Sequence, residues 1–268
     1  GIPVWGDPDP GAMEQIQMCA ADDRVAGAAL MADHHLGYSM PIGGVVAYRE
    51  SVSPSGVGYD IGCGNLATRT DLPYTEIKSR LARLMDDIFE QIAFGVGRKN
   101  PNPVDHPVLH DPIWKEVDEL KGLHKLACDQ LGTVGSGNHY VDLLVDEDGM
   151  VLVGVHFGSR GFGHHTASGF LNLAAGRKWG AKAPGEKMVQ PATVLDLRTP
   201  LGQAYWKAMT LAGRYAYAGR ELVVKEVLGI LGAKSLESVH NNHNLAWEET
   251  HHGEKLIVVR KGATPAAP

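Results

Sequence analysis

An aspartate and a cysteine stand three residues apart in a glycine-rich stretch, residues 56–64, with the sequence GVGYDIGCG. The carboxylate of Asp60 and the thiol of Cys63 are both metal-ligand types. Glycine loses more backbone freedom on folding than any other residue and adds no packing, so these four glycines are not there to build core. We interpret the stretch as a loop that brings its backbone and two ligands close to a metal ion.

Three other stretches place histidines or asparagines among small or polar residues: GSGNH at 135–139, HFGSRG at 156–161 and HNNHN at 240–244. Imidazole, thiolate and carboxylate together suit a transition metal, because magnesium and calcium prefer oxygen ligands. Zinc, iron and manganese stay open on this chemistry, and the thiolate slightly favours zinc. The alternative, in which the cysteine and each histidine are structural, is disfavoured because the pattern recurs in four loops.

The segments between these loops must position them. Apolar residues at three- and four-residue steps predict a helix over residues 75–93. Further helices are expected near 112–130, 161–178 and 200–231, the last broken or ended near Gly229 and Gly232. Strands are expected at residues 25–31, 43–47, 66–70, 140–145, 151–156 and 256–260.

The two strands at 140–145 and 151–156 are predicted to form a hairpin whose turn is residues 146–149. Antiparallel strands have their outer ends side by side. His139 and His156, at those outer ends, are therefore expected to lie together. Because strands and helices alternate without a strict βαβ repeat, we expect a mixed α/β or α+β fold with the site at strand ends and glycine-rich loops.

Composition limits the class of protein. The chain has 268 residues, 44% of them hydrophobic, and a net charge of −6, which argues against non-specific coating of nucleic acid. Three dispersed cysteines do not form a disulfide framework, and no stretch is apolar enough to span a membrane. We expect a cytoplasmic protein. Residue 1 is glycine and residues 262–268 trail off after a predicted strand, so the chain looks cut at both ends, although a flexible tail is an alternative.

Several of these stretches resemble the RtcB family of RNA-splicing ligases, in the same order along the chain. They are residues 56–64 (GVGYDIGCG), 135–140 (GSGNHY), 156–161 (HFGSRG), 243–244 (HN) and 260–264 (RKGAT), with DHHLG at 33–37 and IGGV at 42–45 as further support. The resemblance implies an RtcB-like catalytic domain over residues 1–268, with mixed sheets flanked by helices.

It also implies a ligase, dependent on GTP and two manganese ions, that joins an RNA 3'-phosphate or 2',3'-cyclic phosphate to a 5'-hydroxyl. The residues that match the family's metal ligands are Asp60, Cys63, His139, His156 and His243, with Cys63 bridging the two ions. The residues that match its guanine-nucleotide contacts are Asn138, His139, Tyr140, Val141, Asp142, His243 and Asn244.

Three further residues are expected to take part in catalysis beside Cys63. Arg160 lies between glycines four residues after His156 and has the guanidinium geometry that binds phosphate. Asp33 and His35 are expected to orient ligands or transfer protons. Phe157 replaces the family's usual small hydroxyl residue and Asp142 its usual glutamate, and both changes are expected to affect phosphate contacts rather than metal ligands.

The family's guanylylated histidine lies in a C-terminal region that does not follow Pro268 in this sequence. We therefore expect the chain to hold metal without completing the ligation cycle. Two other functions stay open: a metal-dependent phosphoesterase that opens a cyclic phosphate, and a module that binds RNA ends without turnover. The sequence does not indicate which RNA is bound or the oligomeric state.

Overall fold

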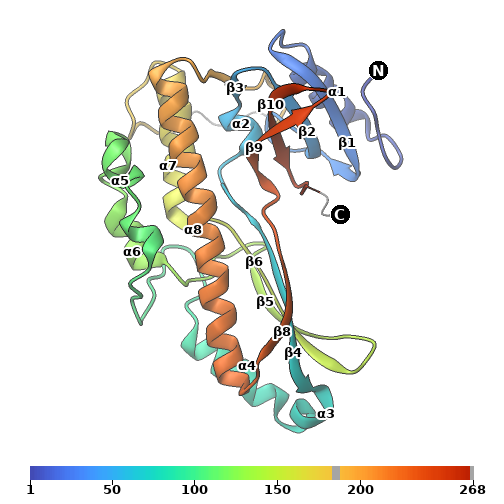
Figure 1. Ribbon diagram of the computed structural model, residues 1–268, viewed down its shortest axis with the longest axis vertical. Helices are drawn as coiled ribbons and strands as arrows, with labels where there is room; N and C mark the ends of the chain where they lie inside the picture. The colour runs from blue at the N-terminus through green and yellow to red at the C-terminus, as the bar shows by residue number, and fades with distance from the viewer. Residues whose placement is uncertain (183–187, 266–268) are drawn as a thin grey trace.

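The computed structural model describes residues 1–182 and 188–265. In these residues two four-stranded sheets lie one beyond the other along a single long helix, α8 (Figure 1). The upper sheet has the order β1-β2-β10-β9 and the lower sheet β5-β6-β4-β8, and all neighbouring strands are antiparallel. The strands are β1 Val25–His35, β2 Ile42–Tyr48, β4 Gly64–Pro73, β5 Tyr140–Val145, β6 Met150–Phe157, β8 Ser235–His240, β9 Asn244–His251 and β10 Glu254–Lys261. A short pair joins β3 Ser51–Val52 to β7 Leu195–Asp196.

Helix α8, Pro200–Leu231, connects two separate hydrophobic cores. The hydroxyl of Thr199 accepts a hydrogen bond from the Gly202 amide at 3.1 Å and caps its first turn. Gly232 ends it in the left-handed conformation, at φ 70°. The first half of α8 buries Tyr205 and Leu211 in the upper core, and its last turns bury Val227 in the lower one.

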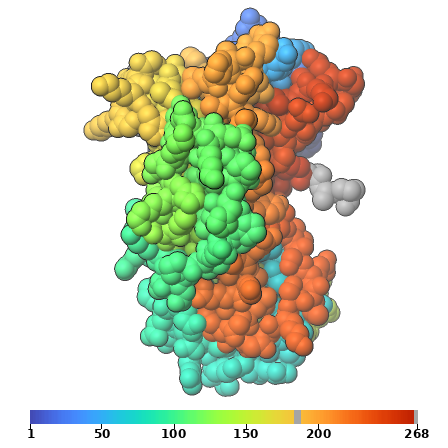
Figure 2. Space-filling view, turned by 60° about the vertical axis from the view of Figure 1, so that its left-hand side comes forward, coloured from blue at the N-terminus to red at the C-terminus, as the bar shows by residue number. Residues whose placement is uncertain are grey.

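The remaining helices pack around these two cores. They are α1 Pro10–Ala20, α2 Pro54–Val57, α3 Tyr74–Ile77, α4 Leu81–Gln91, α5 Ile113–Glu116, α6 His124–Gln130 and α7 Arg160–Ala174, with 3-10 turns at Lys78–Arg80, Pro107–His110 and Asp118–Leu120. Figure 2 shows the green segment that contains α5 and α6 covering part of the orange α8, whose lower turns remain at the surface.

The structure confirms the mixed α and β fold class and shows that it is of the α+β kind. Helices form close to two of the expected ranges, 161–178 and 200–231, and the long one continues through Gly229 to end at Gly232. The single helix expected at 112–130 is wrong, because Val117 has extended backbone angles (φ −108°, ψ 105°) and divides it into short turns. The helix expected at 75–93 is likewise divided, into α3, a 3-10 turn and α4.

Helix α1 and strands β8 and β9 were not among the expected elements. β8 has the sequence SLESVH, and its apolar residues Leu236 and Val239 are both exposed, so it lacks the alternation that marks a half-buried strand. It forms because its backbone pairs with β4 at the edge of the lower sheet. Residues 241–243 are therefore a short passage from β8 in the lower sheet to β9 in the upper sheet.

The predicted hairpin is confirmed. β5 pairs with β6 so that Tyr140 lies opposite His156. At the turn, the Asp146 carboxylate accepts hydrogen bonds from the amides of Asp148 and Met150 at 3.0 and 2.8 Å, and Gly149 takes a φ of 76°. No helix in the described parts of the chain is long and apolar enough to cross a membrane.

Candidate metal centre

The predicted ligands gather where the chain passes between the two sheets. Residues 58–63 lead from α2 to β4, and residues 241–243 lead from β8 to β9. The two passages are bonded to each other through their backbones: the Gly62 amide donates to the Asn244 carbonyl at 2.8 Å, and the His243 amide donates to the Cys63 carbonyl at 2.7 Å. The passages therefore form one layer, against the middle of α8.

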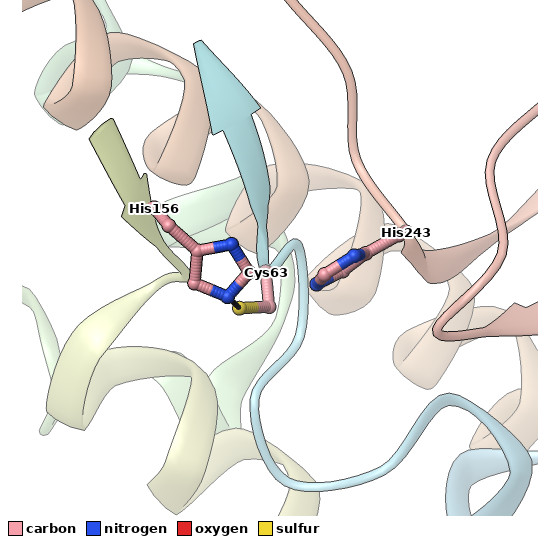
Figure 3. Close-up of side chains that lie close together, drawn as sticks. All are labelled: Cys63, His156 and His243. Atoms are coloured by element: carbon pink, nitrogen blue, oxygen red, sulfur yellow. Dashed lines mark hydrogen bonds between the residues drawn. The ribbon is translucent and has the colours of Figure 1, made fainter. Parts of the chain in front are cut away.

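Five side chains from four segments converge on this layer, in two groups of three. The potential ligand atoms of Asp60, Cys63 and His139 lie within 4.8 Å of one another, and so do those of Cys63, His156 and His243. Cys63 belongs to both groups. Figure 3 shows the rings of His156 and His243 on either side of the Cys63 side chain. The Cys63 sulfur lies 3.3 Å from Nε2 of His156 and 3.8 Å from Nε2 of His139.

His156 is held with one nitrogen directed at the thiol. Its Nδ1 donates to the side-chain oxygen of Asn65 at 2.8 Å, which leaves the lone pair of Nε2 facing Cys63. Burial lowers the pKa of His156 to about 4, helped by the neighbouring imidazoles of His243 and His139. The ring is therefore neutral at neutral pH, the form in which a histidine binds metal.

His139 has a different pair of partners. Its Nε2 lies 2.8 Å from the carboxylate of Asp60, and its Nδ1 accepts from Arg160 at 3.2 Å. Burial opposes ionisation of Asp60, but the hydrogen bond from His139 and the charges of His139 and Arg160 lower its pKa overall. Burial and the charge of Asp60 raise the pKa of Cys63, so without a metal the thiol keeps its proton at neutral pH.

The glycines around the site make space for ligands. A Cβ atom on Gly158 would collide with the carboxylate of Asp60, and one on Gly135 would collide with the His139 ring. A Cβ on Gly64 would collide with the carbonyl of Asn241. The glycines were expected to let other groups come close to the backbone. The groups that do so are the side chains of candidate ligands and the backbone of residue 241.

The residues of β5 that are expected to contact a nucleotide lie on both faces of the strand, because side chains alternate along it. Tyr140 and Asp142 are exposed on one face, and the Tyr140 ring stacks on His156 with centroids 5.3 Å apart. Val141 points the other way, into the lower core, so only its backbone is available to a ligand. Asn138 is exposed, with its side-chain nitrogen 3.5 Å from Nε2 of His156.

Asn244 acts as a link within the layer. Its side-chain oxygen accepts from the Gly262 amide at 2.9 Å, and its side-chain nitrogen donates to the Asp60 carbonyl at 3.5 Å.

Arg160 lies in the site but is incompletely paired. It takes a left-handed backbone conformation, with φ 57°, at the start of α7. One Nη donates to His139, whereas its buried Nε has no hydrogen-bond partner. Strain and an unpaired buried donor together are typical of a group whose partner is a ligand.

Asp33 and His35 lie outside the two groups, at the end of β1, and both are exposed. His35 bonds only locally, with Nδ1 2.9 Å from the Asp33 carbonyl. The expectation that Phe157 alters phosphate contacts is not supported by its position, because its ring is buried in the lower core, where it faces Gly219.

Two residues beside the ligands were not found from the sequence. Asn65 orients His156, and Arg220 of α8 bonds to the loops that carry three ligands. Asn65 follows Cys63 at the two-residue spacing that places side chains on one face of a strand, a signal that was present in the sequence. Arg220 lies within a long helix and has no local signature.

Comparison with known proteins points to one family of ligases. The family profile described as tRNA-splicing ligase RtcB matches residues 15–119 and 115–268. A protein of Pyrobaculum aerophilum named tRNA-splicing ligase RtcB is 32% identical over 89% of this chain and 62% of its own length. A protein of the same name from Thermococcus kodakarensis is also 32% identical, over 89% of this chain and 61% of its own length.

The RNA-splicing ligase RtcB1 of Escherichia coli is 28% identical over 99% of this chain and 70% of its own length. The chain thus spans less than two thirds of the length of the two archaeal relatives, at 62% and 61%.

Proposed function

This chain belongs to the RtcB family, and from that premise we propose that it forms the catalytic core of an RNA ligase dependent on GTP and manganese. The reaction proposed is the joining of an RNA 3'-phosphate or 2',3'-cyclic phosphate end to a 5'-hydroxyl end. The observation that carries the proposal is the pair of three-residue groups that share Cys63. A cytoplasmic location is proposed with it.

The donor set fits two divalent transition-metal ions. Asp60, Cys63 and His139 would hold one, and Cys63, His156 and His243 the other, with the thiolate common to both. The carboxylate suits manganese, the imidazoles and the thiolate also suit zinc, and the choice of manganese follows the family resemblance. A shared thiolate would reduce the repulsion between two dications. Bound ions would neutralise phosphate oxygens and help to orient the reacting groups.

Arg160 is proposed to bind a phosphate of the RNA end or of the nucleotide. Its guanidinium is beside the ligands, and its buried Nε has no partner, so this donor is available to a phosphate. Asn138, Tyr140, Asp142 and Asn244, with the backbone of Val141 and the rings of His139 and His243, are proposed to border the guanine nucleotide.

Asp33 and His35 are proposed to act at the edge of the site rather than as ligands. Burial is the largest influence on the pKa of His243 and lowers it. The negative charge of Asp33 acts in the opposite direction, which shows that Asp33 lies near the ring. This proximity supports a role in proton transfer or in orienting a ligand.

The test begins with metal content. The chain is dialysed against manganese and its bound metal is counted, with two ions expected per chain and a large loss in Cys63→Ala. The chain is then incubated with RNA fragments that carry a 2',3'-cyclic phosphate or a 5'-hydroxyl, with and without GTP. Joined product that requires GTP and manganese supports the ligase. Opening of the cyclic phosphate without GTP would contradict it and favour a phosphoesterase. RNA-end binding by a chain that holds no manganese, unchanged in Cys63→Ala, would contradict it and favour an RNA-end-binding module.

A further inference from the structure

An arginine from α8 lies beneath the ligand-bearing segments and is completely buried. Arg220 has 0% exposed surface. Burial lowers the pKa of its guanidinium to about 10, so it remains charged at neutral pH. Burying a charge is costly unless each of its donors finds a partner, and the partners of Arg220 therefore indicate its role.

Every N–H group of Arg220 has an acceptor. Nη1 donates to the carbonyls of Gly62 and Phe157 at 2.9 and 2.6 Å. Nη2 donates to the carbonyl of Asn241 and the side-chain oxygen of Asn242 at 3.3 and 2.6 Å. Nε donates to Nε2 of His240 at 2.9 Å. A guanidinium has five N–H groups in a fixed plane, so this set uses all of them.

Three of these partners are sequence neighbours of candidate ligands. Gly62 precedes Cys63, Phe157 follows His156, and Asn242 precedes His243. One rigid group thus contacts all three segments of the second ligand group.

The same helix also holds the end of β8. Tyr217, one turn before Arg220, stacks on the His240 ring with centroids 3.7 Å apart. Its hydroxyl donates to the His240 carbonyl at 2.8 Å. Helix α8 is therefore bonded to His240, the residue just before this passage, and to Asn241 and Asn242 within it.

We propose that Arg220 is a positioning residue for the metal centre: by bonding to Gly62, Phe157 and Asn242 it sets the separation of Cys63, His156 and His243 before metal binds. The inference rests on the proposed metal centre and adds a residue to it. Arg220 acts through the neighbours of the ligands, and its effect depends on the flat five-donor geometry. An ammonium group, with three donors on a flexible stem, does not reproduce it.

The test compares Arg220→Lys and Arg220→Met with the same changes at Arg214. Arg214 lies on the same helix, is half exposed and pairs with Asp111 at 2.6 Å, so it controls for loss of an arginine from α8. Cobalt is titrated into each chain, because a cobalt–thiolate bond gives an ultraviolet charge-transfer band that reports the placement of Cys63. Both Arg220 variants should lose about 10- to 100-fold in cobalt and manganese affinity, with a weaker or shifted band. Both Arg214 variants should match the unchanged chain.

A second measurement needs no metal. The amides of Cys63 and His243 are bonded to the carbonyls of Asp60 and Cys63 at 3.1 and 2.7 Å. Their hydrogen exchange should be faster in metal-free Arg220→Lys and unchanged in Arg214→Lys. If the unchanged chain binds no metal, the proposed function fails, whereas this exchange still reports on Arg220.

Rescue by lysine decides between geometry and charge. If Arg220→Lys keeps the affinity, the band and the exchange rates of the unchanged chain, Arg220 supplies only charge and the proposal is overturned. If the Arg220 variants do not fold, Asn242→Ala removes a single acceptor. It should weaken metal binding by about tenfold and speed exchange at His243, and unchanged values for both would equally overturn the proposal.

Discussion

Two regions of the molecule contain the same kinds of side chain in different surroundings. The ligand cluster (Asp60, Cys63, His139, His156 and His243) and the segment 33–35 (Asp33, His34 and His35) both combine carboxylate and imidazole groups. The cluster draws its members from four segments, and they converge on a buried thiol. In segment 33–35 the residues come from one strand end and bond elsewhere: His34 contacts the Asp9 amide and the Met31 carbonyl.

The difference indicates that residue type does not by itself make a metal site. Alternation along β1 turns His34 to the face opposite Asp33 and His35. In the cluster, separate segments are brought to one place by the hairpin, by the bonded passages between the sheets and by α8. Convergence requires this long-range packing.

Of the changes that test this comparison, loss of the shared thiol should lower metal affinity most. Cys63→Ala removes a member of both three-residue groups, so manganese affinity should fall by more than the roughly 10- to 100-fold that follows loss of a group outside the ligands. Cys19→Ala is the matched control, because Cys19 is equally buried, at 2% exposed, but lies in α1. Manganese titration measures both variants. Equal affinities would mean that Cys63 contributes no more to metal binding than a buried cysteine outside the cluster.

A methyl group added beside the cluster should have the next largest effect. In Gly158→Ala the new Cβ collides with the carboxylate of Asp60, which must turn away from His139. Metal affinity should fall about tenfold or more. Gly27→Ala on β1 meets no atom within 4 Å and should leave affinity unchanged. A loss of affinity in Gly27→Ala, or none in Gly158→Ala, would show that the close approach at Gly158 does not limit binding.

The pH dependence of metal binding should identify the buried thiol. Burial and Asp60 raise the pKa of Cys63, so the metal-free thiol is protonated at neutral pH and must release that proton on binding. The imidazole of His156, with a pKa of about 4, has already lost its proton. Above about pH 7, affinity should therefore rise about tenfold per pH unit while one proton is released.

Calorimetry in buffers of different ionisation enthalpy counts the proton directly. His35→Ala should keep the slope because it leaves the thiol in place. A flat profile between pH 7 and 8 would mean that the thiol is ionised before the metal arrives.

The smallest effect is expected in segment 33–35. His35→Ala changes an exposed side chain with a local hydrogen bond, so metal affinity should stay within about twofold and stability within about 0.5 kcal/mol. Manganese titration and denaturant unfolding measure the two quantities. A loss of affinity as large as that of Gly158→Ala would place His35 with the ligands and end the contrast between the two regions.

The sequence predicted the parts of the site that depend on local pattern. Asp60 and Cys63 were identified from glycine spacing, and the approach of His139 to His156 followed from hairpin geometry alone. Their assignment as ligands came from residue chemistry and from the resemblance to a family, and it remains a prediction.

The parts that depend on long-range packing were missed. β8 has no alternating pattern, because it lies at an exposed edge of the sheet. Residues 240–244 were therefore interpreted as a loop that follows the long helix directly, and the strand between them was missed. Arg220 is one charged residue in a helix of 32 residues, and its role depends on loops up to 158 residues away in sequence. Val117 ended an expected helix through its backbone conformation, which its residue type does not dictate.

The pairing of β2 with β10 has a consequence for synthesis of the protein. It joins residues 44–48 to residues 257–261, and the passage that holds His243 leads into β9, which pairs with β10. A ribosome therefore delivers Asp60 and Cys63 long before the partners that complete their surroundings. Until then the nascent chain exposes a thiol and the unpaired edge of β2, and a metal ion that meets it early finds at most one of the two groups of ligands.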